Sequence, residues 1–248
     1  MNEATVQYDH SSSANAPASS GIGGALLGRA AVVVWNDVAA EGRDQFYEWH
    51  DKEHMPERLA IPGFRRGRRY VNQGHSPEWL TLYEAGNLDV VTSANYLARL
   101  NSPTSQTVAT LRYFRNTSRA VCQLISSVGS SSGGHVLAMR LDVSEAQSQA
   151  MRTHLDFHVF PRAMALTGIV ACHLYAADPS ASFVHTAESR TRDFDVPSWV
   201  ILVEATRFDA AGHAQSLVDS SALSRLGVAV RNDAAVYSLE ISRLATVQ

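Results

Sequence analysis

The pattern of hydrophobic and polar positions along the chain predicts the same order of strands and helices in each half. In the first half, β-branched and aromatic runs predict strands at 31–38, 67–72, 79–84 and 119–128, with helices at 44–54 and 93–100. The first helix is expected to end before Pro56, because proline cannot continue an interior helical turn. In the second half we expect strands near 135–143, 169–176, 198–206 and 235–244, and helices near 145–165 and 210–219.

Segments of the two halves resemble each other. Residues 79–85 read WLTLYEA and residues 199–205 read WVILVEA, and each segment follows a proline by two residues. Upstream, FYEWHDKEHMP aligns with MRTHLDFHVFP, which ends at Pro161. The repeated order of strand, helix, strand, strand, helix and strand is that of the ferredoxin-like unit. We therefore predict an ancient tandem duplication.

The predicted fold class is α+β: two tandem ferredoxin-like β-α-β-β-α-β units that pack sheet to sheet as an intrachain dimeric α/β barrel. This packing would cover the sheet face that the helices of each unit leave bare. Residues 1–28 are rich in Ser, Ala and Gly and are predicted to form a disordered tail. Residues 29–128 form the first unit, with the expected active site, and a Ser/Gly linker at 129–134 leads to the second unit at 135–248.

Composition narrows the class of partner. The 248 residues are 45% hydrophobic and 18% charged, with a formal net charge of −3, which is typical of a soluble globular protein. The negative charge argues against a nucleic-acid partner, and no segment approaches the roughly 20 apolar residues of a membrane span. Two widely spaced cysteines, Cys122 and Cys172, exclude a disulfide-framed secreted domain and favour the cytoplasm.

His54 is the first candidate for chemistry. It lies at the expected end of the helix, where its side chain can turn into the space between helices and sheet. An imidazole with a pKa near 6.5 suits proton transfer at neutral pH, although a histidine at a helix end can also simply bond the last carbonyls. His50, Glu53 and His54 together spell the His-x-x-Glu-His pattern of some zinc enzymes. The ferredoxin-like pattern supplies no third ligand, so we predict that the site holds no metal. Because His50 and His54 could still bind zinc as a pair, this alternative stays open.

Two arginines and a glutamate of the predicted sheet are further candidates. Arg68 and Tyr70 should share one face of their strand and Arg69 should lie on the other. Such an arginine could bind a carboxylate, phenolate or enolate, or simply pair with acidic surface residues. Glu84, which recurs as Glu204, is interpreted as a general base with a raised pKa, as the partner of an arginine, or as an exposed strand end.

The order EHMP, PGF and RRY between Glu53 and Tyr70 resembles the EthD-like branch of the dimeric α/β-barrel superfamily. That resemblance covers residues 30–126 best, and residues 135–246 only in fold. The superfamily includes cofactor-free monooxygenases, muconolactone-type isomerases, polyketide cyclases, dehydratases and haem enzymes, so its fold does not fix a reaction. In EthD-like relatives the matching histidine lines a pocket, which implies a catalytic role for His54.

These observations predict a cofactor-independent enzyme of lyase or isomerase type. It would dehydrate, decarboxylate or isomerise an apolar oxygenated aromatic, lactone or polyketide-like compound, with His54 as acid and base. The alternatives are a cofactor-free monooxygenase that uses the same base, and a ligand-binding barrel without catalysis. The partner is expected to be a small molecule, and a homodimer is left open. The expected catalytic residues are His54, Arg69 and Tyr83, and the expected substrate-binding residues are Trp49, His50, Arg68, Tyr70 and Glu84.

The second half lacks the histidine of the first. The position that matches His54 is Val159, so one working pocket is expected in the chain.

Overall fold

β-branched and aromatic runs form the strands, close to where the sequence predicts them. The computed structural model describes residues 25–191, 195–218, 223, 225–231 and 234–246. The strands are β1 (Ala30–Val38), β2 (Phe64–Val71), β3 (Trp79–Ala85), β4 (Phe114–Gly129), β5 (His135–Asp142), β6 (Ile169–Ala177), β7 (Trp199–Ala205), β8 (Ala229–Val230) and β9 (Ala235–Leu244). The helices are α1 (Arg43–Trp49), α2 (Met55–Leu59), α3 (Leu88–Thr92), α4 (Ala94–Asn101), α5 (Ser105–Leu111), α6 (Glu145–His154), α7 (Phe160–Met164), α8 (Pro179–Ser182) and α9 (Phe208–Gln215).

Eight of these strands close into an antiparallel barrel. Their order is β7-β6-β4-β1-β3-β2-β9-β5, and pairing of β5 with β7 completes the circle. The short β8 pairs with the end of β5. The predicted order of strand, helix, strand, strand, helix and strand is found from β1 to β4, whereas in the second half α8 lies between β6 and β7 and the short β8 precedes β9. The last strand of each half pairs with the second strand of the other half, through β4–β6 and β2–β9, so both seams of the barrel join the two halves.

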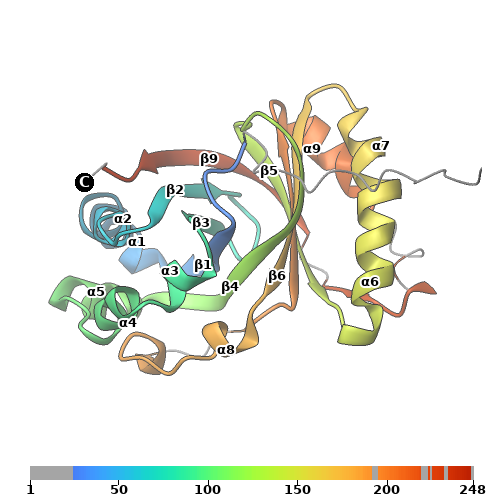
Figure 1. Cartoon of the computed structure of the whole chain (residues 1–248). Coiled ribbons are helices and arrows are strands. Elements are labelled where there is room, and N and C mark those ends of the chain that lie inside the picture. Colours follow the sequence, from blue (N-terminus) through green and yellow to red (C-terminus); the bar gives the residue numbers. More distant parts are fainter. Residues whose placement is uncertain (1–24, 192–194, 219–222, 224, 232–233, 247–248) are drawn as a thin grey trace, which may run out of the picture.

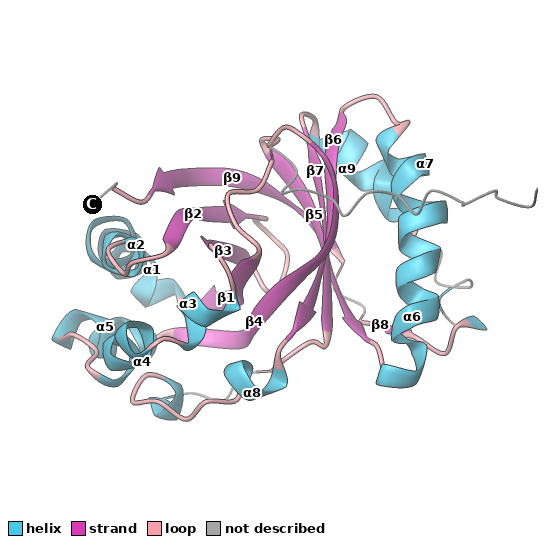
Figure 2. Cartoon of the chain, in the orientation of Figure 1, coloured by secondary structure: helices cyan, strands magenta, loops and turns pink. Residues whose placement is uncertain are grey.

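Two layers of helices cover the outside of the barrel, on opposite sides (Figures 1 and 2). Helices α1, α2, α4 and α5 lie beside the first half, and α6, α7 and α9 lie beside the second. On the second side the space between helices and sheet is filled by a large cluster of buried apolar side chains, among them Met151, Leu155 and Phe160.

The expectation that the first helix ends before Pro56 is wrong. After α1 a π-helical turn, η2 (His50–His54), leads directly into α2, so the helix continues to Leu59. A π turn widens the helix ahead of the proline, whose ring and missing N–H a regular interior turn would not accommodate. The second half does the same with η3 (Leu155–Val159) before Pro161. Both histidines of the His-x-x-Glu-His pattern therefore lie on a π turn, a feature that is frequent at functional sites.

The described part of the predicted tail is not separate from the barrel. Residues 1–24 lie outside the described residues, but Ala25 and Leu26 are only 1% and 2% exposed. The backbone N–H of Leu27 donates to Oε2 of Glu84 over 2.8 Å. Residues 25–28 thus pack onto the barrel and enter β1 directly.

A cluster of charged side chains lies inside the barrel, among apolar residues such as Trp35 and Leu82. Arg68 lies 2.8 Å from Oε1 of Glu204 and 3.1 Å from Oε1 of Glu84, and all three side chains are almost fully buried. Burial alone would raise the pKa of Glu204, but the adjacent His173 and Arg68 lower it to about 2. Of the interpretations offered for Glu84, the partner of an arginine is confirmed.

A long connection between β6 and β7, residues 178–198, crosses from the second half to the helices of the first. Within it, α8 packs against β4, and the N–H of Glu188 donates to the carbonyl of Leu100 at the end of α4. Connections between paired strands are usually much shorter. This segment places second-half residues over the first half of the barrel.

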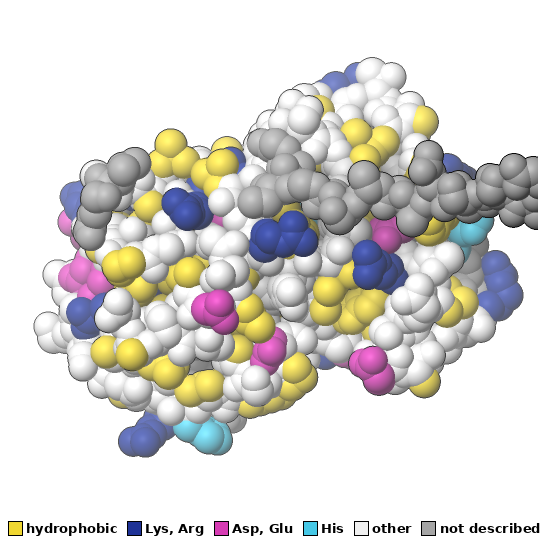
Figure 3. Space-filling view, in the orientation of Figure 1, with side chains coloured by type: hydrophobic (Ala, Val, Ile, Leu, Met, Phe, Trp, Pro, Cys, Tyr) yellow, Lys and Arg dark blue, Asp and Glu magenta, His cyan; other side chains and the backbone are white. Residues whose placement is uncertain are grey.

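In the described part of the chain, no helix has the length and hydropathy needed to cross a membrane. On the face of the molecule seen in Figure 3, basic and acidic side chains are scattered among one another and form no continuous basic stripe.

We expect Arg68→Met to lower the free energy of unfolding by about 3–5 kcal/mol, because buried Glu204 loses its guanidinium partner and Glu84 keeps only Arg66. Urea unfolding at pH 7 measures the effect. Arg65→Met, at an exposed position on the same strand, is the control and should change stability by about 0.5 kcal/mol or less. The triple variant Arg68→Met/Glu84→Gln/Glu204→Gln should recover much of the loss. Equal unfolding curves for Arg68→Met and Arg65→Met would contradict this account of the cluster.

Candidate active site

A cavity lies between the first-half sheet and its covering helices. It has a volume of about 50 Å³, room for roughly four water molecules at about 10–15 Å³ each. Most of its wall is apolar. The polar side chains in the wall are Asn36, His50, His54, Arg58, Thr81, Tyr83, Tyr96, Arg119 and Glu188, and the apolar ones include Val32, Val34, Phe46, Trp49, Phe64, Leu100, Leu111 and Phe114.

Strand alternation divides the candidates between the two faces of the sheet, as the sequence predicts. Thr81 and Tyr83 of β3 face the helices and the cavity, whereas Leu82 and Glu84 face the barrel interior. On β2, Arg69 faces the helices. The structure therefore brings His54, Tyr83, His50 and Trp49 together around the cavity, with Arg69 directly behind them. Arg68, Tyr70 and Glu84, which we expected to bind substrate, lie on the opposite face, inside the barrel.

His50 connects Arg69 to Tyr83. Its Nδ1 lies 2.9 Å from Nη1 of Arg69, and its Nε2 lies 3.1 Å from the hydroxyl of Tyr83. Arg69 is held in turn by Asp51 over 2.5 Å and by Glu240 over 2.7 Å. This chain of bonds fixes the Tyr83 hydroxyl at the wall of the cavity.

The geometry also fixes where the protons lie. A guanidinium can only donate, so Nδ1 of His50 accepts from Arg69 and the ring proton is on Nε2. Nε2–H then donates to the oxygen of Tyr83. The hydroxyl proton of Tyr83 is therefore not used in this bond, and it can be donated to a group inside the cavity.

Burial sets the charge states of His50 and Tyr83. Desolvation, reinforced by the charges of Arg69 and Arg58, lowers the pKa of His50 well below its usual value, so the ring is neutral at pH 7. Burial raises the pKa of Tyr83, although Arg58 and Arg69 act in the opposite direction. Tyr83 is thus a neutral hydroxyl that can donate a hydrogen bond.

His54 lies one turn further along the helix and also lines the cavity. Its ring stacks on the indole of Trp49 with centroids 4.2 Å apart, and its centroid is 6.4 Å from that of Tyr83. Nε1 of Trp49 donates to the hydroxyl of Thr107 on α5 over 3.0 Å, which holds the indole in place. His54 is partly exposed, whereas His50 is buried.

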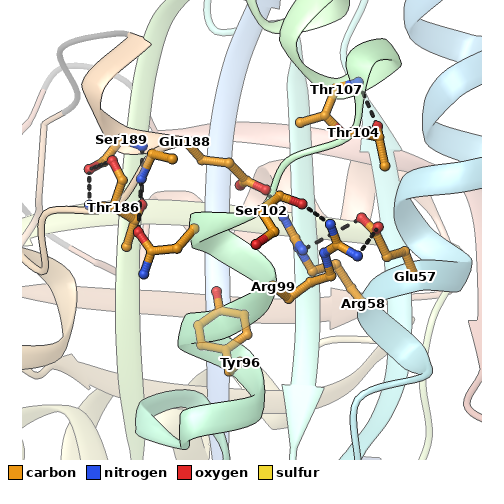
Figure 4. A network of polar contacts seen from close by, with 12 residues as sticks. Glu57, Arg58, Tyr96, Arg99, Ser102, Thr104, Thr107, Thr186, Glu188 and Ser189 are labelled. Atoms are coloured by element: carbon orange, nitrogen blue, oxygen red, sulfur yellow. Dashed lines mark hydrogen bonds and ion pairs between the residues drawn. The ribbon is translucent and has the colours of Figure 1, made fainter.

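Several lining residues were missed by the sequence analysis. Arg58 is 3% exposed and donates from Nη2 to Glu188, which reaches it from the long connection after α8 (Figure 4). Glu57, on the same helix, pairs with Arg99 of α4 over 3.0 Å. Arg58 was detectable in principle: if the helix continues through Pro56, His54 and Arg58 are four residues apart and share one helix face. For Glu188, the only sequence feature that could have indicated a role was the unusual length of the connection between β6 and β7.

The wall does not form a site for a metal or a large cofactor. Across the residues that the structure describes, no group of three or more His, Cys, Asp and Glu side chains is arranged to hold a metal ion. A haem does not fit the cavity, which has room for a few water molecules, and both ring nitrogens of His50 already have hydrogen-bonding partners.

Comparison with solved structures identifies the fold. The chain superposes on an anthrone oxidase-like protein with a TM-score of 0.59 and 9% identity, over 87% of this chain and 92% of that one. A variant of the chlorite dismutase from Candidatus Nitrospira defluvii gives a TM-score of 0.52 and 11% identity, over 86% and 92% of the two chains. No protein-family model and no curated protein sequence matches the chain. The likeness extends to the fold alone, an antiparallel β-barrel with helices on its outside that is closed within one chain.

We expect stability to fall as the pH is lowered from 7.5 to 5, partly because of His50. Below about 6.5 the unfolded chain takes up a proton at this residue, whereas the folded chain does so only at lower pH. The contribution is therefore complete above about 6.5, and it decreases by at most about 1.4 kcal/mol per pH unit below that. Urea unfolding at several pH values should give a shallower slope for His50→Gln than for wild type. His213→Gln, at an exposed position on α9, should keep the wild-type slope, and equal slopes for all three proteins would contradict the prediction.

Proposed function

We propose that the protein is a cofactor-independent enzyme of lyase or isomerase type that removes a proton from carbon in a small oxygenated substrate. One observation carries the proposal: the Tyr83 hydroxyl accepts from His50, so its own proton faces a largely apolar cavity that His54 also lines. A base and a hydrogen-bond donor on one apolar cavity are the groups needed to form and stabilise an enolate. The small volume of the cavity favours a small substrate.

In the proposed reaction a ring nitrogen of His54 takes a proton from a carbon next to a carbonyl. The electron pair of the broken C–H bond moves onto the carbonyl oxygen, and the Tyr83 hydroxyl donates to the oxyanion that develops. Arg69 and His50 are positioning residues, because they hold that hydroxyl without touching the substrate. Return of the proton to another carbon completes an isomerisation, whereas loss of a β-hydroxyl as water completes a dehydration.

A cofactor-free monooxygenase is the second candidate, and the likeness to an anthrone oxidase-like protein favours it. The same carbanion would form a C–O bond with molecular oxygen, and loss of water would leave a carbonyl where a CH₂ group had been. Uptake of one O₂ per product identifies this reaction, and turnover without O₂ uptake identifies the lyase or isomerase. A protein that binds ligands and catalyses neither reaction would be a ligand-binding barrel.

We also infer that the chain is an internal duplication of a ferredoxin-like unit, related to the EthD-like branch. Two repeated details support this inference: a π turn precedes both Pro56 and Pro161, and Glu84 and Glu204 each accept a backbone N–H over 2.8 Å. Because the barrel closes within one chain, a homodimer would have to form through the outer surface. Cys122 and Cys172 are buried free thiols, which supports a reducing cytoplasmic environment.

The proton-transfer step can be tested without knowing the natural substrate. Single-ring ketones and butenolides are incubated in D₂O with the protein, and NMR follows exchange of the acidic C–H. We expect wild type to catalyse exchange of at least one compound, His54→Ala to slow it by about 10²–10⁴-fold, and Tyr83→Phe by about 10²–10³-fold.

His213→Ala, which changes an exposed histidine far along the chain on α9, is the matched control and should exchange at the wild-type rate. Circular dichroism establishes that each variant is folded. Full activity of folded His54→Ala would overturn its assignment as the base.

A further inference from the structure

One end of the cavity carries a positive charge without a counter-charge. Arg119 of β4 donates from Nη2 to the hydroxyl of Tyr96 over 3.0 Å and from Nη1 to the carbonyl of Ser182 over 3.4 Å. Both partners are neutral, and none of the described carboxylates lies within ion-pair distance of its guanidinium. Arg119 is half-buried, and it differs from the buried arginines described in the first half, Arg58, Arg68 and Arg69, each of which pairs with a carboxylate.

A second arginine in the same wall has unused hydrogen-bonding capacity. Nη2 of Arg58 pairs with Glu188, but Nη1 is buried, has no hydrogen-bond partner among the described residues, and lies 3.7 Å from Glu57. The lining therefore holds two guanidinium groups and one carboxylate, Glu188. An apolar cavity with one excess positive charge favours a ligand that carries one negative charge.

The position of Arg119 shows where that charge would bind. Tyr96, Leu100, Arg119 and Glu188 line both the main cavity and a smaller adjoining one of about 20 Å³, between α4 and the connection after α8. His50, His54 and Tyr83 line only the main cavity. Arg119 therefore lies where the two cavities adjoin, beside the second-half segment, whereas the proposed reacting groups belong to the main cavity alone.

We propose that Arg119, assisted by Nη1 of Arg58, binds a carboxylate of the substrate, and that the substrate is a single-ring monocarboxylic acid. The proposal deepens the function proposed above and rests on it for the statement that the ligand is a substrate. The carboxylate lies against Arg119 and the Tyr96 hydroxyl, and the ring extends along the apolar wall toward Tyr83 and His54. Arginine suits this role because its planar fork matches a carboxylate with two parallel bonds.

Binding tests the proposal independently of catalysis. Calorimetric titration of the full chain uses benzoate and, as its neutral counterpart of the same shape, benzamide. We expect benzoate to bind about ten- to a hundredfold more tightly than benzamide, and Arg119→Gln to bring the ratio close to one. Arg119→Lys, which keeps the charge and loses the fork, should give an intermediate ratio.

Arg115→Gln is the matched control, because Arg115 lies on the same strand, is exposed and, within the described part of the chain, bonds only to backbone carbonyls. It should keep the wild-type ratio. Equal affinities of wild type for the two probes, no binding of benzoate, or an unchanged ratio in folded Arg119→Gln would each overturn the proposal. The first two outcomes need no variant, so misfolding cannot obscure them. If benzoate binds as expected while His54→Ala leaves proton exchange unaffected, the anion site stands and the proposed reaction fails.

Discussion

The barrel depends on one buried guanidinium that is shared by both halves. Arg68 faces Glu84 of its own half, which also pairs with Arg66, and Glu204 of the other half. The charges of the two arginines are therefore balanced only when Glu204 is brought to Arg68 in this register. Taking three charges out of water costs several kcal/mol for each ion, so the cluster contributes little net stability compared with an apolar core. Its effect is on specificity: a strand slip of one residue would move a charge to the apolar outer face.

Consecutive arginines of β2 serve opposite faces of the same sheet. Arg68 organises the inside of the barrel, and Arg69, one residue later, holds His50 and through it Tyr83. The polar network at the cavity is therefore anchored on a strand whose position the barrel interior has already fixed. Such rigid support is what a hydrogen-bond donor needs if it is to stabilise a developing charge without rearrangement.

Patterns local to the sequence predicted the strands, their order and the faces of β2 and β3, because alternation has a strict period of two residues. They failed at Pro56, where a π turn lets the helix continue, and that error hid Arg58. The choice between a base and an ion pair for Glu84 could not be made locally, because its partners depend on the tertiary fold. The role of Glu188 could not be predicted for the same reason, because it contacts Arg58 only across the interface of the two halves.

The connection that carries Glu188 also determines when, during synthesis of the chain, the cavity wall can be completed. A ribosome releases the first half with β4 and β2 lacking their seam partners β6 and β9, and with the cavity wall lacking Glu188. His54 and Tyr83, the proposed catalytic residues, are thus synthesised early, but their site is complete only after β9 has left the ribosome. A single second-half codon, that of Glu188, can then change the charge of the cavity wall without any change in the codons of the proposed proton-transfer groups.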